Sequence, residues 1–126
     1  MNKIIPLVEW PKEKGEYRIV QFWNKIEERP YLRFNEDEKY LFFHSDIVRK
    51  FAKDFEIEIE EISKGNESLV FLKENDLIAI VGMGWSNLNP EIKEGQFWGE
   101  SKTYNWKIFG GHLERLNKFY PDWKFK

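Results

Sequence analysis

Two stretches of this chain are apolar on both faces of an extended strand, and they restrict its fold more than any other feature. In Glu16–Trp23 the odd-numbered and the even-numbered positions are both largely apolar, and Leu77–Val81 (LIAIV) is apolar throughout. A strand of this kind needs other parts of the protein on both of its sides. The sequence therefore predicts a sheet covered on both faces, with Leu77–Val81 as a central strand.

Helical periodicity marks two further segments. In Ser45–Phe55 the apolar side chains fall on one stripe and the charged ones on the other, and Ser45 can cap the first turn. A second helix is expected from His112 to about Phe119, with Pro121 ending it. Both helices are expected to pack on the sheet.

The other expected elements are short and separated by turn residues. They are strands at Tyr31–Phe34, Glu56–Ile62 and Trp123–Lys126, a turn at Asn35–Glu38, a hairpin of Ser68–Leu72 with Leu77–Val81, and an irregular lead-in over residues 1–15. Together the elements predict an α/β fold. We expect one domain spanning residues 1–126, with a mixed sheet of about five or six strands and the two helices packed on it.

Composition excludes several classes of function. The net charge is −2, from 20 basic and 22 acidic side chains, whereas a protein that binds duplex nucleic acid needs a basic surplus. The absence of cysteine excludes disulfides, thiolate zinc sites and cysteine catalysis, and 2 histidines are too few for a multi-histidine metal site. No apolar run approaches the ~18 residues of a membrane span. We therefore expect a cytoplasmic protein with no membrane partner, whose oligomeric state the sequence leaves open.

His44 is the first candidate for chemistry, because it directly precedes the expected helix start at Ser45. Unpaired backbone N–H groups and the positive end of the helix dipole make such a position an anion site. A histidine beside it can move protons near neutral pH. The simpler alternative is a partly buried histidine that hydrogen-bonds to backbone, and the pattern alone favours that alternative.

The segment Gly82–Asn87 (GMGWSN) is the second candidate, because it follows the expected central strand. Ligands gather beyond the carboxyl ends of strands in α/β sheets, where glycines let backbone amides approach an anion. An ordinary glycine turn is the alternative, since the spacing matches neither nucleotide fingerprint. Trp85, Trp98 and Trp106 can line a pocket or a partner surface. The aromatic residues expected in the core are Tyr17, Trp23, Phe34, Phe42, Phe51 and Phe71.

Three short motifs stand in the same order as in a known family. His44–Ile47 (HSDI) opens the first helix, Val81–Gly84 (VGMG) follows the central strand, and Tyr120–Trp123 (YPDW) closes the last helix. In this order, over most of the chain from Glu16 onward, the sequence resembles the Janus/Ocnus family of protein-histidine phosphatases.

The resemblance implies that His44 is the catalytic residue, acting as a general base on water or accepting the phosphoryl group itself. It also implies that no metal or cofactor takes part. The phosphate would be held by backbone amides of His44, Ser45, Met83, Gly84, Trp85 and Ser86.

Basic residues are where the sequence departs from the family pattern. The basic residue expected at the start of the first strand falls on Glu16, two residues before Arg18. An arginine expected ahead of the histidine falls near Glu36, and one expected on the hairpin falls near Ser68. Because a phosphoryl group needs positive charge or hydrogen-bond donors, we expect Arg18 to supply part of that charge.

These features predict a phosphohistidine phosphatase-like hydrolase that acts on a phosphorylated protein or a small phosphate-bearing substrate. Two alternatives remain open. One is a non-catalytic module that binds an anion or a phosphopeptide in the same pocket. The other is an interaction protein that uses the Trp85–Trp106 segment, with His44 in a structural role.

Overall fold

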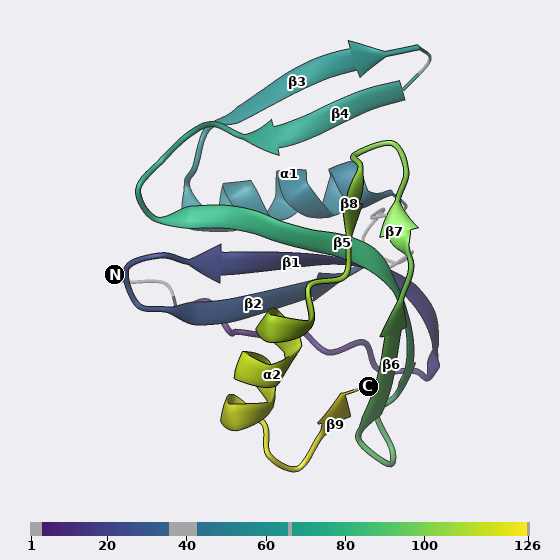
Figure 1. Cartoon of the computed structure of the whole chain (residues 1–126). Helices are drawn as coiled ribbons and strands as arrows, with labels where there is room; N and C mark the ends of the chain where they lie inside the picture. The colour runs from purple at the N-terminus through teal and green to yellow at the C-terminus, as the bar shows by residue number, and fades with distance from the viewer. Residues whose placement is uncertain (1–3, 36–42, 66, 126) are drawn as a thin grey trace.

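The structure is a computed structural model that describes residues 4–35, 43–65 and 67–125 (Figure 1). The expected turn at Asn35–Glu38, apart from Asn35, and the expected core residue Phe42 lie outside the described residues. The elements follow one another as β1 (Gly15–Asn24), β2 (Arg29–Phe34), α1 (His44–Phe55), β3 (Ile59–Lys64), β4 (Glu67–Leu72), β5 (Ile78–Asn89), β6 (Glu94–Trp98), β7 (Glu100–Ser101), β8 (Trp106–Lys107), α2 (Gly110–Phe119) and β9 (Lys124–Phe125).

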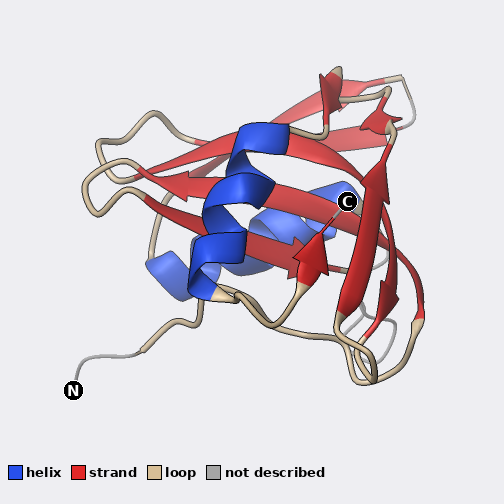
Figure 2. Cartoon of the chain, turned by 60° about the horizontal axis from the view of Figure 1, so that its bottom comes forward, coloured by secondary structure: helices blue, strands red, loops and turns tan. Residues whose placement is uncertain are grey.

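A curled five-stranded sheet forms the centre of the molecule, in the order β2-β1-β5-β6-β9. β1 is antiparallel to β2 and β5, β5 is antiparallel to β6, and β6 is parallel to β9, so the sheet is mixed. The two helices lie on opposite faces of the sheet (Figure 2). The predicted α/β fold, with two helices packed on a mixed sheet, is confirmed.

The alternation along β1 decides which side chains meet which helix. Val20 and Phe22 pack on the side of α1, where the rings of Phe22 and Phe51 stack with their centroids 3.7 Å apart. Ile19 packs on the opposite side with Leu116 of α2. Both faces of β1 are therefore buried, as its sequence predicted.

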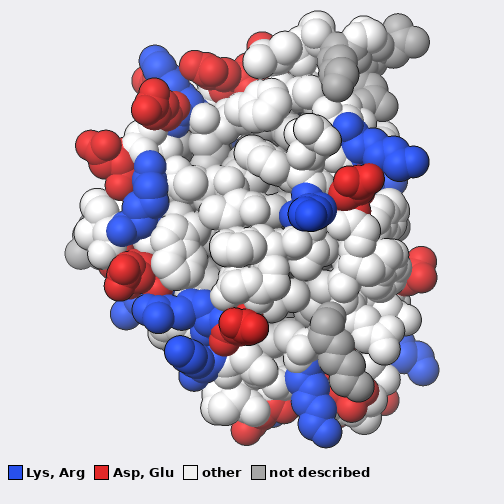
Figure 3. All heavy atoms as spheres, viewed as in Figure 1, with Lys and Arg blue, Asp and Glu red and all other residues white. Residues whose placement is uncertain are grey.

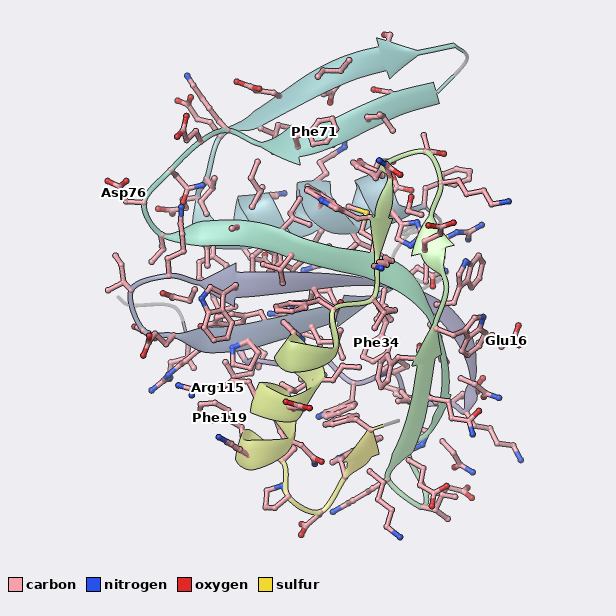
Figure 4. All side chains as sticks on the ribbon, in the orientation of Figure 1. Glu16, Phe34, Phe71, Asp76, Arg115 and Phe119 are labelled. Carbon is pink, nitrogen blue, oxygen red and sulfur yellow. The ribbon has the colours of Figure 1, made fainter. Side chains whose placement is uncertain are left out.

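The lead-in before β1 has little regular structure but is held in place. It runs along the outer edge of β2, where Val8 forms a bridge with Leu32. The guanidinium of Arg33 donates hydrogen bonds to the carbonyl oxygens of Pro6 and Leu7, at 2.7 and 2.9 Å. Farther along, the ring of Trp10 stacks on Trp123 with the centroids 3.8 Å apart. Val8 and Trp10 of the lead-in and Trp123 after α2 thus join the packing on the α2 side, where Phe34 also lies (Figure 4).

The predicted hairpin is wrong, because β4 pairs with β3 and not with β5. The cause lies in the connection between β4 and β5. There the side-chain oxygen of Asn75 accepts hydrogen bonds from the N–H groups of Leu77 and Ile78, at 2.8 and 2.7 Å. This tight turn directs the chain away from β4 and alongside β1. The β3–β4 hairpin then packs over α1, with Val70 fully buried.

The predicted loop at Gly82–Asn87 is also wrong, because these residues belong to β5. Each of them lies opposite a residue of β1, and β6 pairs with β5 from Trp85 onward. The glycines serve close packing of the β8–α2 connection on the sheet. A Cβ on Gly84 would lie 2.7 Å from the side chain of Ile108, and one on Gly82 would overlap the side chain of Gln21.

Candidate functional site

His44 is the first residue of α1, and its side chain links the N-terminus of this helix to β5. His44 is 8% exposed, and its Nε2 donates a hydrogen bond to the carbonyl oxygen of Gly84 at 3.0 Å. The expectation that Ser45 caps the helix is wrong. The helix is capped instead by the carboxylate of Asp46, which accepts the N–H of Phe43 at 3.0 Å. This arrangement moves the helix start back by one residue, so that His44 itself stands in the first turn.

The surroundings of His44 favour its neutral form. Burial holds the pKa of His44 below its usual value of 6.5; the hydrogen bond to Gly84 opposes this shift, and the charge of Arg18 adds to it. A carbonyl oxygen only accepts, so the proton of the neutral ring is on Nε2 and the lone pair is on Nδ1. His44 therefore combines the hydrogen bond to backbone that the simpler alternative predicted with a nitrogen that can accept a proton.

A pocket of about 490 Å³ opens beside the N-terminus of α1. Its walls come from β1, the first turns of α1, β4 and the turn between β7 and β8. The residues that line it are Arg18, Phe43, His44, Ser45, Asp46, Arg49, Ser68, Leu69, Ser101, Thr103 and Tyr104. Two guanidinium groups and one carboxylate are among them, so the lining carries a formal charge of +1 when His44 is neutral.

Arg18 is held over aromatic rings at the edge of this pocket. It lies directly opposite Trp85 in the β1–β5 register. Its guanidinium carbon is 4.6 Å from the ring centroid of Trp85 and 5.6 Å from that of Phe43. The backbone N–H of Arg18 donates to the side chain of Asn35 at 2.5 Å. On β1, Arg18 shares its strand face with Val20 and Phe22, which is the face that meets α1.

Arg49 is a pocket residue that sequence reasoning missed. It stands one helical turn after Ser45 and forms an ion pair with Glu61 of β3. Residues four apart on a helix share a face, so the helical period of Ser45–Phe55 contained the signal. The family pattern expects an arginine near Ser68 on the hairpin, and Ser68 lines the same pocket.

Tyr104 forms the far wall of the pocket and holds it to β4. Its hydroxyl accepts the N–H of Val70 at 2.8 Å and donates to the carbonyl oxygen of Val70 at 2.9 Å. Its ring packs with Trp106 and Phe71. No local pattern in the sequence indicates this contact, because Val70 and Tyr104 are far apart along the chain.

The remaining predicted phosphate-binding residues do not form a loop around the pocket. Met83 is fully buried beneath α1, and Ser86 lies on the opposite face of the sheet, where its hydroxyl donates to the carbonyl oxygen of Tyr17 at 3.3 Å. Gly84 contributes its carbonyl oxygen to His44. In a paired strand the amides lie in the plane of the sheet and point to neighbouring strands, so they do not converge on an anion. Of the predicted site residues, the structure thus brings His44, Ser45 and Arg18 together in the pocket. The ring of Trp85 packs against the guanidinium of Arg18 and does not line the pocket.

Among the described residues, the other candidates named from the sequence, His112, Trp98 and Trp106, do not line this pocket. Glu36 lies outside the described residues. His112 is 1% exposed and is the third residue of α2, where Nε2 donates to the carbonyl oxygens of Tyr31 and Phe22 at 2.9 and 3.1 Å. Trp106 packs on Phe71, whereas Trp98 is 42% exposed.

Neither protein-family models nor curated proteins give a match to this chain. Across residues 4–35, 43–65 and 67–125, no group of three or more His, Cys, Asp or Glu side chains is arranged to hold a metal ion. Within the same part of the chain, no helix is both long and apolar enough to span a membrane. On the face in view in Figure 3, basic and acidic side chains are mixed around the margin.

Proposed function

We propose that the protein is a phosphohistidine phosphatase-like hydrolase that binds a phosphoryl group in the pocket at the N-terminus of α1. One observation carries the proposal: a histidine held neutral stands in the same pocket as two arginines and the first turn of a helix. The substrate would be a phosphorylated protein or a small phosphate-bearing molecule in the cytoplasm. The likeness of the His44–Ile47 motif to the Janus/Ocnus pattern supports the same activity.

The phosphoryl group would be held by charge and by the helix end. Arg18 and Arg49 face the pocket from β1 and α1. The N–H groups of His44 and Ser45 belong to the first turn, where an α-helix has no internal acceptor for them. A phosphate oxygen near them would also meet the Ser45 hydroxyl. The charge that the family pattern takes from other positions would come here from Arg18 and Arg49.

The chemical step would use Nδ1 of His44. As a general base, Nδ1 takes a proton from the water that attacks phosphorus. As a phosphoryl acceptor, it forms a P–N bond first, which water breaks in a second step. In either case the substrate P–N bond breaks and the leaving imidazole takes up a proton. The hydrogen bond from Nε2 to Gly84 orients the ring for both roles.

The test is phosphate release from a phosphohistidine peptide by wild type, His44→Ala and His44→Gln. Glutamine can still donate to the carbonyl oxygen of Gly84 but has no basic nitrogen, so it is the matched control for ring position. Both variants are expected to lose at least about 100-fold in kcat. Turnover by His44→Gln at the wild-type rate would contradict the proposal.

The arginines are tested by phosphate binding. Arg18→Ala and Arg49→Ala are each expected to weaken binding of inorganic phosphate by about 1.5–3 kcal/mol, the range for a hydrogen bond to a charged group. Glu61→Gln is the control for Arg49, because it removes the ion pair but leaves the guanidinium in place. If phosphate binds in an Arg18-dependent way and no substrate turns over, the protein is a non-catalytic anion-binding module. The low exposure of His44 is the observation that favours this second function.

A further inference from the structure

On the side of the sheet that meets α1, the sheet continues beyond the N-terminus of this helix, and its side chains there are half-buried or exposed. On the face of β5 that meets α1, Met83 is fully buried, Trp85 is half-buried and Asn87 is exposed. The helix begins at His44, which is bonded to Gly84, so the residues after Gly84 on this face lie past its end. The opposite face stays buried over the same stretch, as Ser86 and Leu88 show.

Five side chains make up this face, which we call the aromatic shelf: Asn87, Gln96 and Trp98 are exposed, whereas Arg18 and Trp85 are half-buried. Strand register places Arg18, Trp85 and Trp98 in one row across β1, β5 and β6. Asn87 and Gln96 are directly opposite each other in the next row, which Glu16 of β1 completes. Figure 4 shows Glu16 at the outer margin of the sheet.

The shelf adjoins the pocket through Arg18. The guanidinium of Arg18 lies over the ring of Trp85 and also lines the pocket that contains His44. Beyond Trp85, Trp98 is 42% exposed. Neighbouring strands are about 5 Å apart, so the row from Arg18 to Trp98 extends about 10 Å from the cationic end to an open aromatic ring. One nucleotide spans such a distance between its phosphate and the far edge of its base.

We propose that the aromatic shelf binds the base of a nucleoside 5′-monophosphate whose phosphate occupies the pocket beside His44. The phosphate end of this inference rests on the function proposed above, and the shelf itself does not. A base stacks on an exposed tryptophan ring through its flat face. The amides of Asn87 and Gln96 carry both donors and acceptors and can pair with the edge of the base.

Two features favour a single nucleotide over larger partners. An extended peptide gains affinity by adding to a strand edge, whereas the shelf is a sheet face whose backbone groups point along the sheet. A longer nucleic-acid strand needs a basic track, whereas the row beside the tryptophans ends in Glu16 and the chain carries a net charge of −2. A mononucleotide needs positive charge only at its phosphate, where Arg18 and Arg49 lie.

The experiment compares binding of adenosine 5′-monophosphate and ribose 5-phosphate by calorimetry. Wild type is expected to bind the nucleotide about 5- to 150-fold more tightly, the range for stacking one base on an aromatic side chain. Trp98→Ala should remove this preference and leave ribose 5-phosphate binding unchanged. Phe119→Ala, which removes an equally exposed aromatic ring (42%) at the end of α2, should keep it.

Further outcomes test the shelf and the pocket separately. Equal binding of the two ligands to wild type, or a preference that survives in Trp98→Ala, overturns the shelf. Phenyl phosphate that binds as tightly as the nucleotide overturns the assignment to a base. Adenosine has no phosphate, so adenosine binding that depends on Trp98 supports the shelf even where ribose 5-phosphate fails to bind. That last failure would contradict the proposed phosphate site alone.

Discussion

At the scale of single residues, His44 has a protonation state that sets when it can act. Burial and Arg18 lower its pKa below 6.5, and only the neutral ring has a lone pair on Nδ1. In the proposed phosphatase reaction, kcat/KM is therefore expected to stay constant from about pH 8 down to pH 6.5. It should fall only as the pH approaches the lowered pKa of His44. Arg18→Gln removes one cause of the shift, so the fall should begin at a higher pH. A pH–rate profile measures both, and a wild-type decline centred above pH 6.5 would contradict the role.

Gly82 is a residue at which a single added methyl group should destabilise the fold. An added Cβ would overlap Oε1 of Gln21 and lie 2.9 Å from the carbonyl oxygen of Lys107. Gly82→Ala is expected to lower the free energy of unfolding by about 1–3 kcal/mol, the usual cost of overpacking. Gly110→Ala is the control, because nothing lies within 4 Å of a Cβ there. Urea unfolding of both variants tests this prediction. Equally small decreases in the free energy of unfolding would contradict it, because they would show that Gln21 and Lys107 can move aside.

At the scale of elements, the β3–β4 hairpin depends on Tyr104. The hydroxyl satisfies the N–H and the carbonyl of Val70 on the edge of β4 that does not face β3. Tyr104→Phe keeps the ring but leaves both groups unpaired, which is expected to cost about 1–3 kcal/mol. Amides of the hairpin should exchange hydrogen faster while those of β1 and β5 keep their protection. Tyr17→Phe is the matched control, because its hydroxyl bonds to an exposed carbonyl of Glu13 and its loss should be close to neutral.

At the scale of the whole molecule, one buried network joins α2 to the sheet. Gln21 accepts the N–H of Phe109 at 2.7 Å, donates to the carbonyl of Phe109 at 3.0 Å and donates to Nδ1 of His112 at 3.2 Å. Nε2 of His112 donates in turn to β1 and β2. Every polar atom of the two side chains thus has a partner while the imidazole is neutral, and a proton on Nδ1 would face the amide N–H group of Gln21.

The stability of the protein should therefore fall in acid. Burial lowers the pKa of His112 to about 4, against 6.5 in the unfolded chain. Between these two values the unfolded state binds a proton that the folded state does not, so the free energy of unfolding decreases as the pH falls from 6.5 to 4, by up to about 3 kcal/mol. The contribution is complete above pH 6.5.

Urea unfolding of wild type and His112→Gln at pH 7.5 and 4.5 measures the effect. Both proteins carry the same carboxylates, so the contribution of these groups to the pH dependence cancels in the comparison. The variant should lose less stability between the two pH values. If it does not fold, the wild-type ring can be followed by NMR, and titration of His112 near pH 6.5 in the native state would refute the prediction.

The features that could be predicted from the sequence are those encoded within a short window of residues. The period of Ser45–Phe55 identified α1, and the alternation of Glu16–Trp23 identified β1, its two buried faces and the face that carries Arg18. The same helical period places Arg49 beside Ser45. These features depend on residues within one or two turns of each other, so local physical chemistry is sufficient to predict them.

Which segments meet in space could not be predicted from local sequence. A turn at Asn75 separates β4 from β5, and the glycines at 82 and 84 make room for Gln21 and Ile108, whose positions no local pattern reveals. The pocket likewise joins β1, α1, β4 and the β7–β8 turn, which are distant along the chain. The pairing of strands and the contents of a pocket depend on these long-range contacts, because the same glycine pattern fits a phosphate loop and a crowded strand equally well until its neighbours are known.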